Sequence, residues 1–161
     1  MTAAISSPTF RDPREPAFRL SVEKFDEMVR VGVLDEDDAV ELLEGLLISK
    51  MPTDPPHDVM VGVIPDALAK LLPAGWFTRA QATLALPDSR PEPDVAVARG
   101  QPFDYLTRHP GPADLALLIE VSDATLARDR GTKLRIYARA GIVEYWIVNL
   151  IDRQIEVHRS P

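Results

Sequence analysis

Two acidic residues stand at the ends of two apolar stretches in the middle of the chain. Asp94 precedes the run "VAVA", and Glu120 lies near the end of "LALLIEV". If these stretches form neighbouring antiparallel strands, the start of one lies beside the end of the other, and the two carboxylates come within a few ångströms. Carboxylates that close raise each other's pKa or need a cation. A hard divalent cation such as Mg²⁺ suits them best, although a solvated strand end is the simpler interpretation of either acid alone.

A lysine in the following helix is the third candidate. At about 100° per residue, Lys133 falls on the apolar face of a helix expected over residues 125–140. The other members of that face are Leu126, Tyr137 and Ala140. An unpaired ammonium on a buried face is costly. Lys133 therefore either extends its ammonium to water or pairs with Asp129 one turn earlier. Alternatively, it reaches the pair Asp94 and Glu120 across the sheet. Geometry alone favours neither possibility.

The opposite face of this helix is basic. Its members are Arg128, Thr132, Arg135 and Arg139. They form either a solvated face, which we favour, or a contact with a DNA backbone. The chain as a whole is acidic, with a net charge of −7. Because phosphate neutralisation supplies most non-specific affinity for DNA, this charge argues mildly against DNA as a partner without excluding it.

Length and composition indicate one domain. A chain of 161 residues with 45% hydrophobic content can bury a real core. Residues 1–17 contain three prolines and few apolar side chains, so we expect a flexible tail there and a single domain over residues 18–161. The absence of cysteine excludes disulfides, thiolate zinc sites and a cysteine nucleophile. No membrane span or export signal is evident, so a cytoplasmic protein is expected.

The pattern of apolar residues alternates between strands and helices. Ser21 is a good N-cap for a first helix, and the turn Glu44-Gly45 predicts a β-hairpin. Further helices are expected over residues 59–72, where Pro65 must kink the helix or mark its first turn, and over residues 125–140. Residues 75–87 are expected to form one strand or a bent pair of strands, and further strands are expected over residues 94–99, 115–121, 143–150 and 154–160. The class is therefore α/β or α+β, with one mixed sheet.

Several stretches together resemble a known family. "PDV", then "IEVSD" and "RDRGTKLRIYARAGIVEYWIV", closely resemble the Uma2 family (DUF820) of restriction-endonuclease-like proteins, within the PD-(D/E)xK nuclease superfamily. The opening "SVEKFDEMVRVGVLDEDDAVELLEG" is similar to that family's N-terminal helix and hairpin. The resemblance runs from about Phe18 to Arg159. It implies a restriction-endonuclease-like fold, in which helices flank a mixed central β-sheet.

The resemblance assigns expected roles to individual residues. Asp94 matches the aspartate of PD, and Glu120 matches the acidic residue of (D/E)xK. The parent motif has a lysine where this chain has Ser122, and the family is similar in moving that lysine to the next helix, which Lys133 fits. Glu41 matches a further acid of the first hairpin. His57 lies where the family often has a histidine, although a surface or structural role is the favoured interpretation.

What the resemblance implies is an Mg²⁺- or Mn²⁺-dependent endonuclease that hydrolyses phosphodiester bonds in DNA. Asp94, Glu120, the Val121 carbonyl and Glu41 would hold the metal, and Lys133 would position or activate the attacking water. Accessory candidates are His57, Asp129 and Tyr137. A homodimer is also expected.

The leading alternative is a non-catalytic, homodimeric interaction module on the same fold. A serine hydrolase using Ser122 and Asp123 has little support, because no G-x-S-x-G elbow is present. The stretch "RGTK" lacks the spacing of a P-loop, so nucleotide binding has no support either.

Overall fold

A five-stranded mixed sheet forms the centre of the computed structural model, which describes residues 17–161. The tail predicted for residues 1–17 lies outside the described residues except for its last position. The strands, in spatial order, are β3 (Trp76–Ala80), β4 (Val95–Arg99), β5 (Leu115–Ser122), β6 (Glu144–Asn149) and β7 (Gln154–Arg159). Neighbouring strands are antiparallel except for β5 and β6, which are parallel. The predicted mixed sheet is confirmed.

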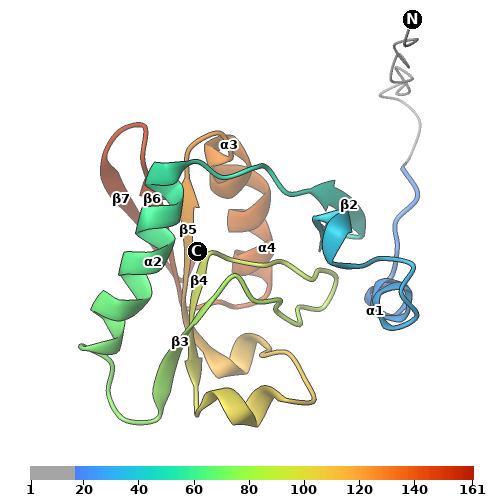
Figure 1. Cartoon of the computed structure of the whole chain (residues 1–161), viewed down its shortest axis with the longest axis horizontal. Coiled ribbons are helices and arrows are strands. Elements are labelled where there is room, and N and C mark those ends of the chain that lie inside the picture. The colour runs from blue at the N-terminus through green and yellow to red at the C-terminus, as the bar shows by residue number, and fades with distance from the viewer. Residues whose placement is uncertain (1–16) are drawn as a thin grey trace, which may run out of the picture.

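Helices cover both faces of this sheet (Figure 1). The covering elements are α2 (Pro55–Ala69) on one side and, on the other, α3 (Leu126–Arg128), the π-helical turn η4 (Asp129–Lys133) and α4 (Leu134–Arg139). Since side chains of a strand alternate between faces, Ile119 and Val121 of β5 join the core beneath α2. Leu118 faces the core beneath α4 together with Tyr137. By the same alternation, Glu120 points towards α4, into a layer that is otherwise apolar.

An N-terminal helix and a β-hairpin complete the fold beside the α4 layer (Figure 1). The helix α1 (Val22–Arg30) begins after Ser21, whose side chain accepts a hydrogen bond from the Lys24 amide. The hairpin consists of β1 (Val40–Leu43) and β2 (Leu46–Ser49). Gly45 in its turn has φ +78°, and a Cβ there would lie 2.9 Å from both the Arg19 Cβ and the Leu20 carbonyl oxygen. Glycine is therefore required for the predicted turn, which is confirmed.

Short 3₁₀ turns lie in the connections and carry no part of the site. They are η1 (Glu36–Asp38), η2 (Pro102–Tyr105) and η3 (Pro112–Asp114). Within residues 17–161, no helix has the length and apolar character needed to cross a membrane.

Two predicted element boundaries are wrong. Helix α2 begins at Pro55 instead of residue 59, because Asp54 caps it by accepting the His57 amide and a proline occupies its first turn. It also continues through Pro65. The strand predicted over residues 75–87 ends at Ala80, since Gln81 adopts φ 46° and its amide donates to the Asp94 carbonyl at 3.0 Å. Both differences bring polar residues to the N-terminal end of β4.

The edge strand β7 is fixed to the helical layer by a carboxylate with a lowered pKa. Arg130 donates to both carboxylate oxygens of Glu156, at 2.6 and 3.0 Å, and the Asn149 amide donates at 2.8 Å. These hydrogen bonds, with Arg130 contributing most, lower the pKa of Glu156 to about 2. A lowered folded-state pKa stabilises the fold above the unfolded-state pKa of about 4.3, and that contribution disappears as the pH falls through the folded value.

Glu156→Gln is therefore expected to lower the thermal unfolding midpoint at pH 7 but to have little effect near pH 2. The difference from wild type should shrink as the pH falls between about 4.3 and 2. Circular dichroism melts over this range measure it. Glu27→Gln is the matched control, because Glu27 makes only an exposed pair within α1 and should change the midpoint little at any pH. A pH-independent effect of Glu156→Gln would contradict the expected linkage.

Candidate active site

A cavity of about 380 Å³ opens where the hairpin, the first turn of α2, the start of β4, the end of β5 and the π-helical turn meet. Four carboxylates and three cationic side chains line it: Glu41, Glu92, Asp94 and Glu120, with Lys50, Arg128 and Lys133. His57, Gln81 and Thr53 complete the polar part of the wall. The structure thus brings Asp94, Glu120, Lys133, Glu41 and His57 together at one place.

Asp94 lies beside the end of β5, where the antiparallel pairing of β4 and β5 carries it. Val95 pairs with Ile119 in this register, as the sequence predicts. The Asp94 carboxylate accepts the Val121 amide at 2.8 Å and lies 3.2 Å from His57 Nε2. Burial raises the pKa of Asp94 despite these two contacts. The ionised form is therefore disfavoured in this site unless a cation approaches.

Lys133 is buried and neutralises two carboxylates. Its Nζ donates to Glu120 Oε1 at 2.9 Å and lies 3.4 Å from Glu41 Oε2. Of the alternatives left open by the sequence, the structure shows the one in which Lys133 reaches a strand carboxylate. Burial alone would lower the pKa of Lys133, but the attraction of Glu120 and then Glu41 outweighs it and raises the pKa above its ordinary value. The neighbouring carboxylates therefore favour the ammonium form of Lys133, which donates hydrogen bonds.

Glu120 has a second buried donor. The hydroxyl of Tyr137 donates to Glu120 Oε1 at 2.8 Å, and burial raises the pKa of the Glu120 carboxyl well above its ordinary range. Burial and the neighbouring Glu120 also raise the pKa of Tyr137, so this hydroxyl keeps its proton. Tyr137 thus lies within the site, as a buried hydrogen-bond donor that holds Glu120.

Asp129 does not pair with Lys133. Its Oδ2 accepts hydrogen bonds from Ser122 Oγ at 2.7 Å and from Thr125 Oγ1 at 2.6 Å. Asp129 is fully buried and begins the π-helical turn. Ser122, which takes the place of the motif lysine, therefore anchors the turn that carries Lys133.

The π-helical turn corrects the assignment of helix faces. The Leu134 amide bonds to the Asp129 carbonyl, five residues back. In a regular α-helix, residues five positions apart point about 140° away from each other, and on that basis the sequence analysis placed Arg128 opposite Lys133. The π turn tightens this separation. Arg128 and Lys133 consequently line the same cavity.

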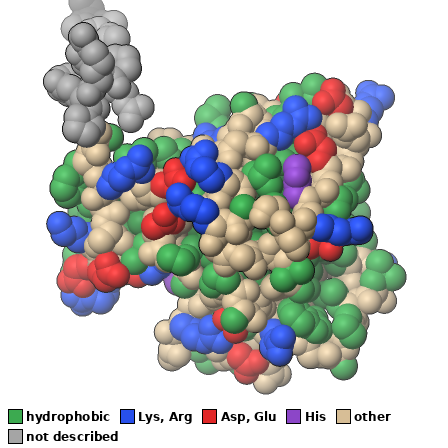
Figure 2. Space-filling model, turned by 180° about the vertical axis from the view of Figure 1, so that it is seen from behind, with side chains coloured by type: hydrophobic (Ala, Val, Ile, Leu, Met, Phe, Trp, Pro, Cys, Tyr) green, Lys and Arg blue, Asp and Glu red, His purple; other side chains and the backbone are tan. Residues whose placement is uncertain are grey.

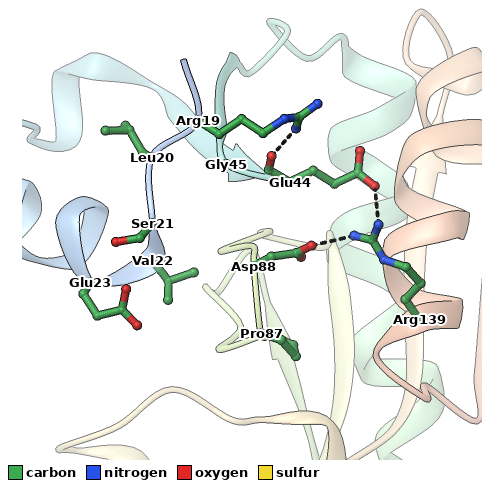
Figure 3. Close-up of a pocket in the computed structure, with 10 residues that line it drawn as sticks. All are labelled: Arg19, Leu20, Ser21, Val22, Glu23, Glu44, Gly45, Pro87, Asp88 and Arg139. Atoms are coloured by element: carbon green, nitrogen blue, oxygen red, sulfur yellow. Dashed lines mark hydrogen bonds and ion pairs between the residues drawn. The ribbon is translucent and has the colours of Figure 1, made fainter. Parts of the chain in front are cut away.

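The two remaining arginines of the predicted basic face form ion pairs with the hairpin and its neighbouring loop. Arg135 donates to both carboxylate oxygens of Glu44, at 2.9 and 2.8 Å. Arg139 pairs with Glu44 at 3.1 Å and with Asp88 at 2.6 Å (Figure 3). Glu44, Asp88 and Arg139 line a cavity of about 480 Å³, and their charges already have partners. We interpret it as the joint between α4 and the hairpin.

Sequence reasoning missed three charged residues of the active-site cavity. Glu92 donates its amide to Glu41 Oε2 at 3.2 Å and pairs through its carboxylate with Lys50. The spacing of "PEPD" was a usable signal for Glu92, because it lies two positions before Asp94 on the same approach to β4. Lys50, directly after the hairpin, carried no comparable signal. The third, Arg128, was assigned to the wrong face.

The donor set suits a hard divalent cation, although the side chains do not form a ready-made metal centre. In the part of the chain from 17 to 161, no three His, Asp or Glu side chains converge as ligands of one ion. The Lys133 ammonium instead lies within reach of both Glu41 and Glu120. The two carboxylates with raised pKa, Asp94 and Glu120, are oxygen donors whose charge a cation would stabilise. The chemistry of these oxygen donors therefore fits the divalent cation that the family resemblance implies.

Comparisons with known proteins agree with this geometry. The model of the Uma2 family, described as "Putative restriction endonuclease", matches residues 22–161. Among solved structures, one similar fold is a "putative nuclease belonging to DUF820" from Anabaena variabilis, with a TM-score of 0.66 and 14% sequence identity over 88% of this chain and 80% of that one. No curated protein matches the sequence.

Proposed function

The chain belongs to the Uma2 family, and we propose that it is a divalent-metal-dependent endonuclease that hydrolyses phosphodiester bonds in DNA. The observation that supports this most is the buried cluster itself. Asp94 and Glu120, both with raised pKa, meet Lys133 at one cavity, and the neighbouring carboxylates raise the pKa of Lys133 as well. Paired acids and a lysine held this way are the chemistry that metal-assisted phosphodiester cleavage needs.

Asp94 and Glu120 would hold the ion, Mg²⁺ or Mn²⁺, with Glu41 adding a direct or water-mediated contact. When bound, the ion polarises the scissile phosphate and lowers the pKa of a bound water. Backbone geometry supports the Val121 carbonyl as a further ligand. Since the amide and carbonyl of one strand residue point to the same side, this carbonyl faces the side on which the Val121 amide meets Asp94. Ser122 directs its carbonyl the other way, to Leu150.

Lys133 would act on the charge that develops at the phosphate. Its raised pKa keeps the ammonium protonated, so it donates hydrogen bonds to the attacking water or to a phosphate oxygen and stabilises negative charge there. Tyr137 would hold Glu120 at the cavity wall through its 2.8 Å hydrogen bond, so that this carboxylate stays available both to Lys133 and to an ion.

Surface charge is consistent with contact through a limited region. Figure 2 shows acidic and basic side chains intermingled on the face drawn there, without a continuous basic field. With a net charge of −7, the protein would engage DNA at its cavity and metal instead of by general attraction. A homodimer, which we also propose, would allow two such cavities to address both strands.

Conversion of supercoiled plasmid to nicked and linear forms tests the proposal. We expect wild-type protein to cleave with Mg²⁺ or Mn²⁺ and to be inactive with EDTA, and we expect Asp94→Ala to be inactive under all conditions. Arg139→Ala, in the charged joint away from the cavity, is the control and should cleave normally. Folded wild-type protein that leaves the plasmid intact with both ions would instead favour a non-catalytic interaction module.

A further inference from the structure

Arg128 differs from the other cations of the active-site cavity in what it pairs with. Lys133 donates to Glu120, and Lys50 pairs closely with Glu92. The Arg128 guanidinium lies 3.7 Å from Glu41 Oε1, beyond hydrogen-bond distance, and its Nη1 contacts the Ser49 carbonyl at 3.4 Å. Among the described residues, Arg128 is thus the cation of this cavity that no carboxylate engages at hydrogen-bond distance.

The fold holds this guanidinium at the cavity wall without burying it. The side chain is 24% exposed, whereas Lys133 beside it is 7% exposed. Arg128 is the last residue of α3, directly before the π-helical turn. The buried hydrogen bonds of Asp129 with Ser122 and Thr125 fix that turn. An arginine in this position is both preorganised and accessible to a molecule that enters the cavity.

The surrounding charges favour an anion as its partner. With four carboxylates against three cations, the cavity repels a polyanion unless a cation meets it. An arginine with free donors offers a planar fork that matches two phosphate oxygens. The other arginines of the same helical segment are already paired. Arg130 and Arg135 make bidentate pairs with Glu156 and Glu44, and Arg139 pairs with Glu44 and Asp88.

We infer that Arg128 binds a backbone phosphate of the DNA strand that lies in the cavity, next to the phosphate held over Asp94 and Glu120. This inference rests on the proposed nuclease function. It makes Arg128 a substrate-binding residue, distinct from Lys133, whose donors serve the reacting phosphate.

Equilibrium binding of a fluorescein-labelled DNA duplex tests the inference, followed by anisotropy with Ca²⁺ in place of Mg²⁺ so that a cation is present in the acidic cavity. A denaturing gel checks that the duplex stays intact. The affinity of the wild-type protein and of three variants for the duplex is measured over about 50 to 200 mM salt. Arg128→Ala is expected to bind about tenfold more weakly at the low-salt end, and the slope of log K against log salt should decrease by about 0.9, the value for one lost phosphate contact. Arg128→Lys should keep the slope and recover part of the affinity. Arg135→Ala is the matched control, from the same helical segment but paired with Glu44, and should equal wild type.

The two proposals give separable outcomes. A reduced slope for Arg128→Ala alone supports the phosphate contact, even if plasmid cleavage fails. An unchanged slope in Arg128→Ala, an equal loss in Arg135→Ala, or no binding of the duplex by wild type overturns it, even if the plasmid is cleaved. Should Arg128→Ala not fold, Arg128→Gln provides the same loss of charge with the side-chain length retained, and the same slope criterion applies to it.

Discussion

Lys133→Met is expected to reduce the cleavage rate by about 10² to 10³, the usual effect of removing a preorganised donor to developing charge. The same change should lower the free energy of unfolding by about 3–5 kcal/mol, because a buried pair that loses one partner leaves an uncompensated charge. Glu120 and Glu41 are 5% and 4% exposed, and both would lose the Lys133 ammonium. Plasmid cleavage and urea denaturation measure the two effects.

A second substitution separates the two consequences. In Lys133→Met with Glu120→Gln, no buried charge is stranded between these two positions, so most of the lost stability should return while cleavage does not recover. Arg135→Met is the control for removing a cation from the same helix. Arg135 is half exposed, and its loss should change stability by less than about 1 kcal/mol. If Lys133→Met unfolds no more easily than Arg135→Met, the ion pair does not hold the site together as described.

Asp94→Asn is expected to separate metal binding from folding. The amide oxygen of asparagine can still accept the Val121 N–H, and a buried carboxyl with a raised pKa is replaced by a neutral group. The metal-free protein should therefore be as stable as wild type or slightly more stable at pH 7. Cleavage should fall by about 10³ or more, because the remaining carboxylates cannot hold the ion in place.

Thermal unfolding with and without Mn²⁺ measures this separation. Wild type should gain stability as Mn²⁺ is added, by about 2.7 kcal/mol when the ion reaches a hundred times its dissociation constant. Asp94→Asn should show no such gain. Asp66→Asn, on the exposed side of α2, is the control and should retain it. A wild-type midpoint that is insensitive to Mn²⁺ and Mg²⁺ would contradict the metal site.

The acidic part of the site could be predicted from the sequence because it depends on regular strand geometry. Once β4 and β5 are recognised as antiparallel neighbours, Asp94 and the end of β5 must meet. Lys133 could be placed on a buried face because the apolar pattern is unambiguous there. Which carboxylate it meets could not be predicted, since that depends on the distance between the helix and the sheet.

Irregular backbone accounts for what the sequence did not reveal. The predicted helix face of Arg128 was wrong, because a rotation of about 100° per residue holds for a regular α-helix and not for a π turn. The contact of His57 with Asp94 was missed because α2 was expected to begin later. Asp54 followed by proline is a recognised start signal and would have placed His57 in the first turn, facing the site.

The hydrogen bond between Ser122 and Asp129 restricts how this family of sites can change over evolution. A lysine restored at position 122 would remove the hydroxyl that anchors the π turn and add a second ammonium to a buried layer. Losing Lys133 first would leave Glu120 without a counter-charge. Either single substitution is therefore expected to destabilise the fold, so a helix-borne lysine could be exchanged for a strand-borne one only if both positions and the anchor of the π turn changed together.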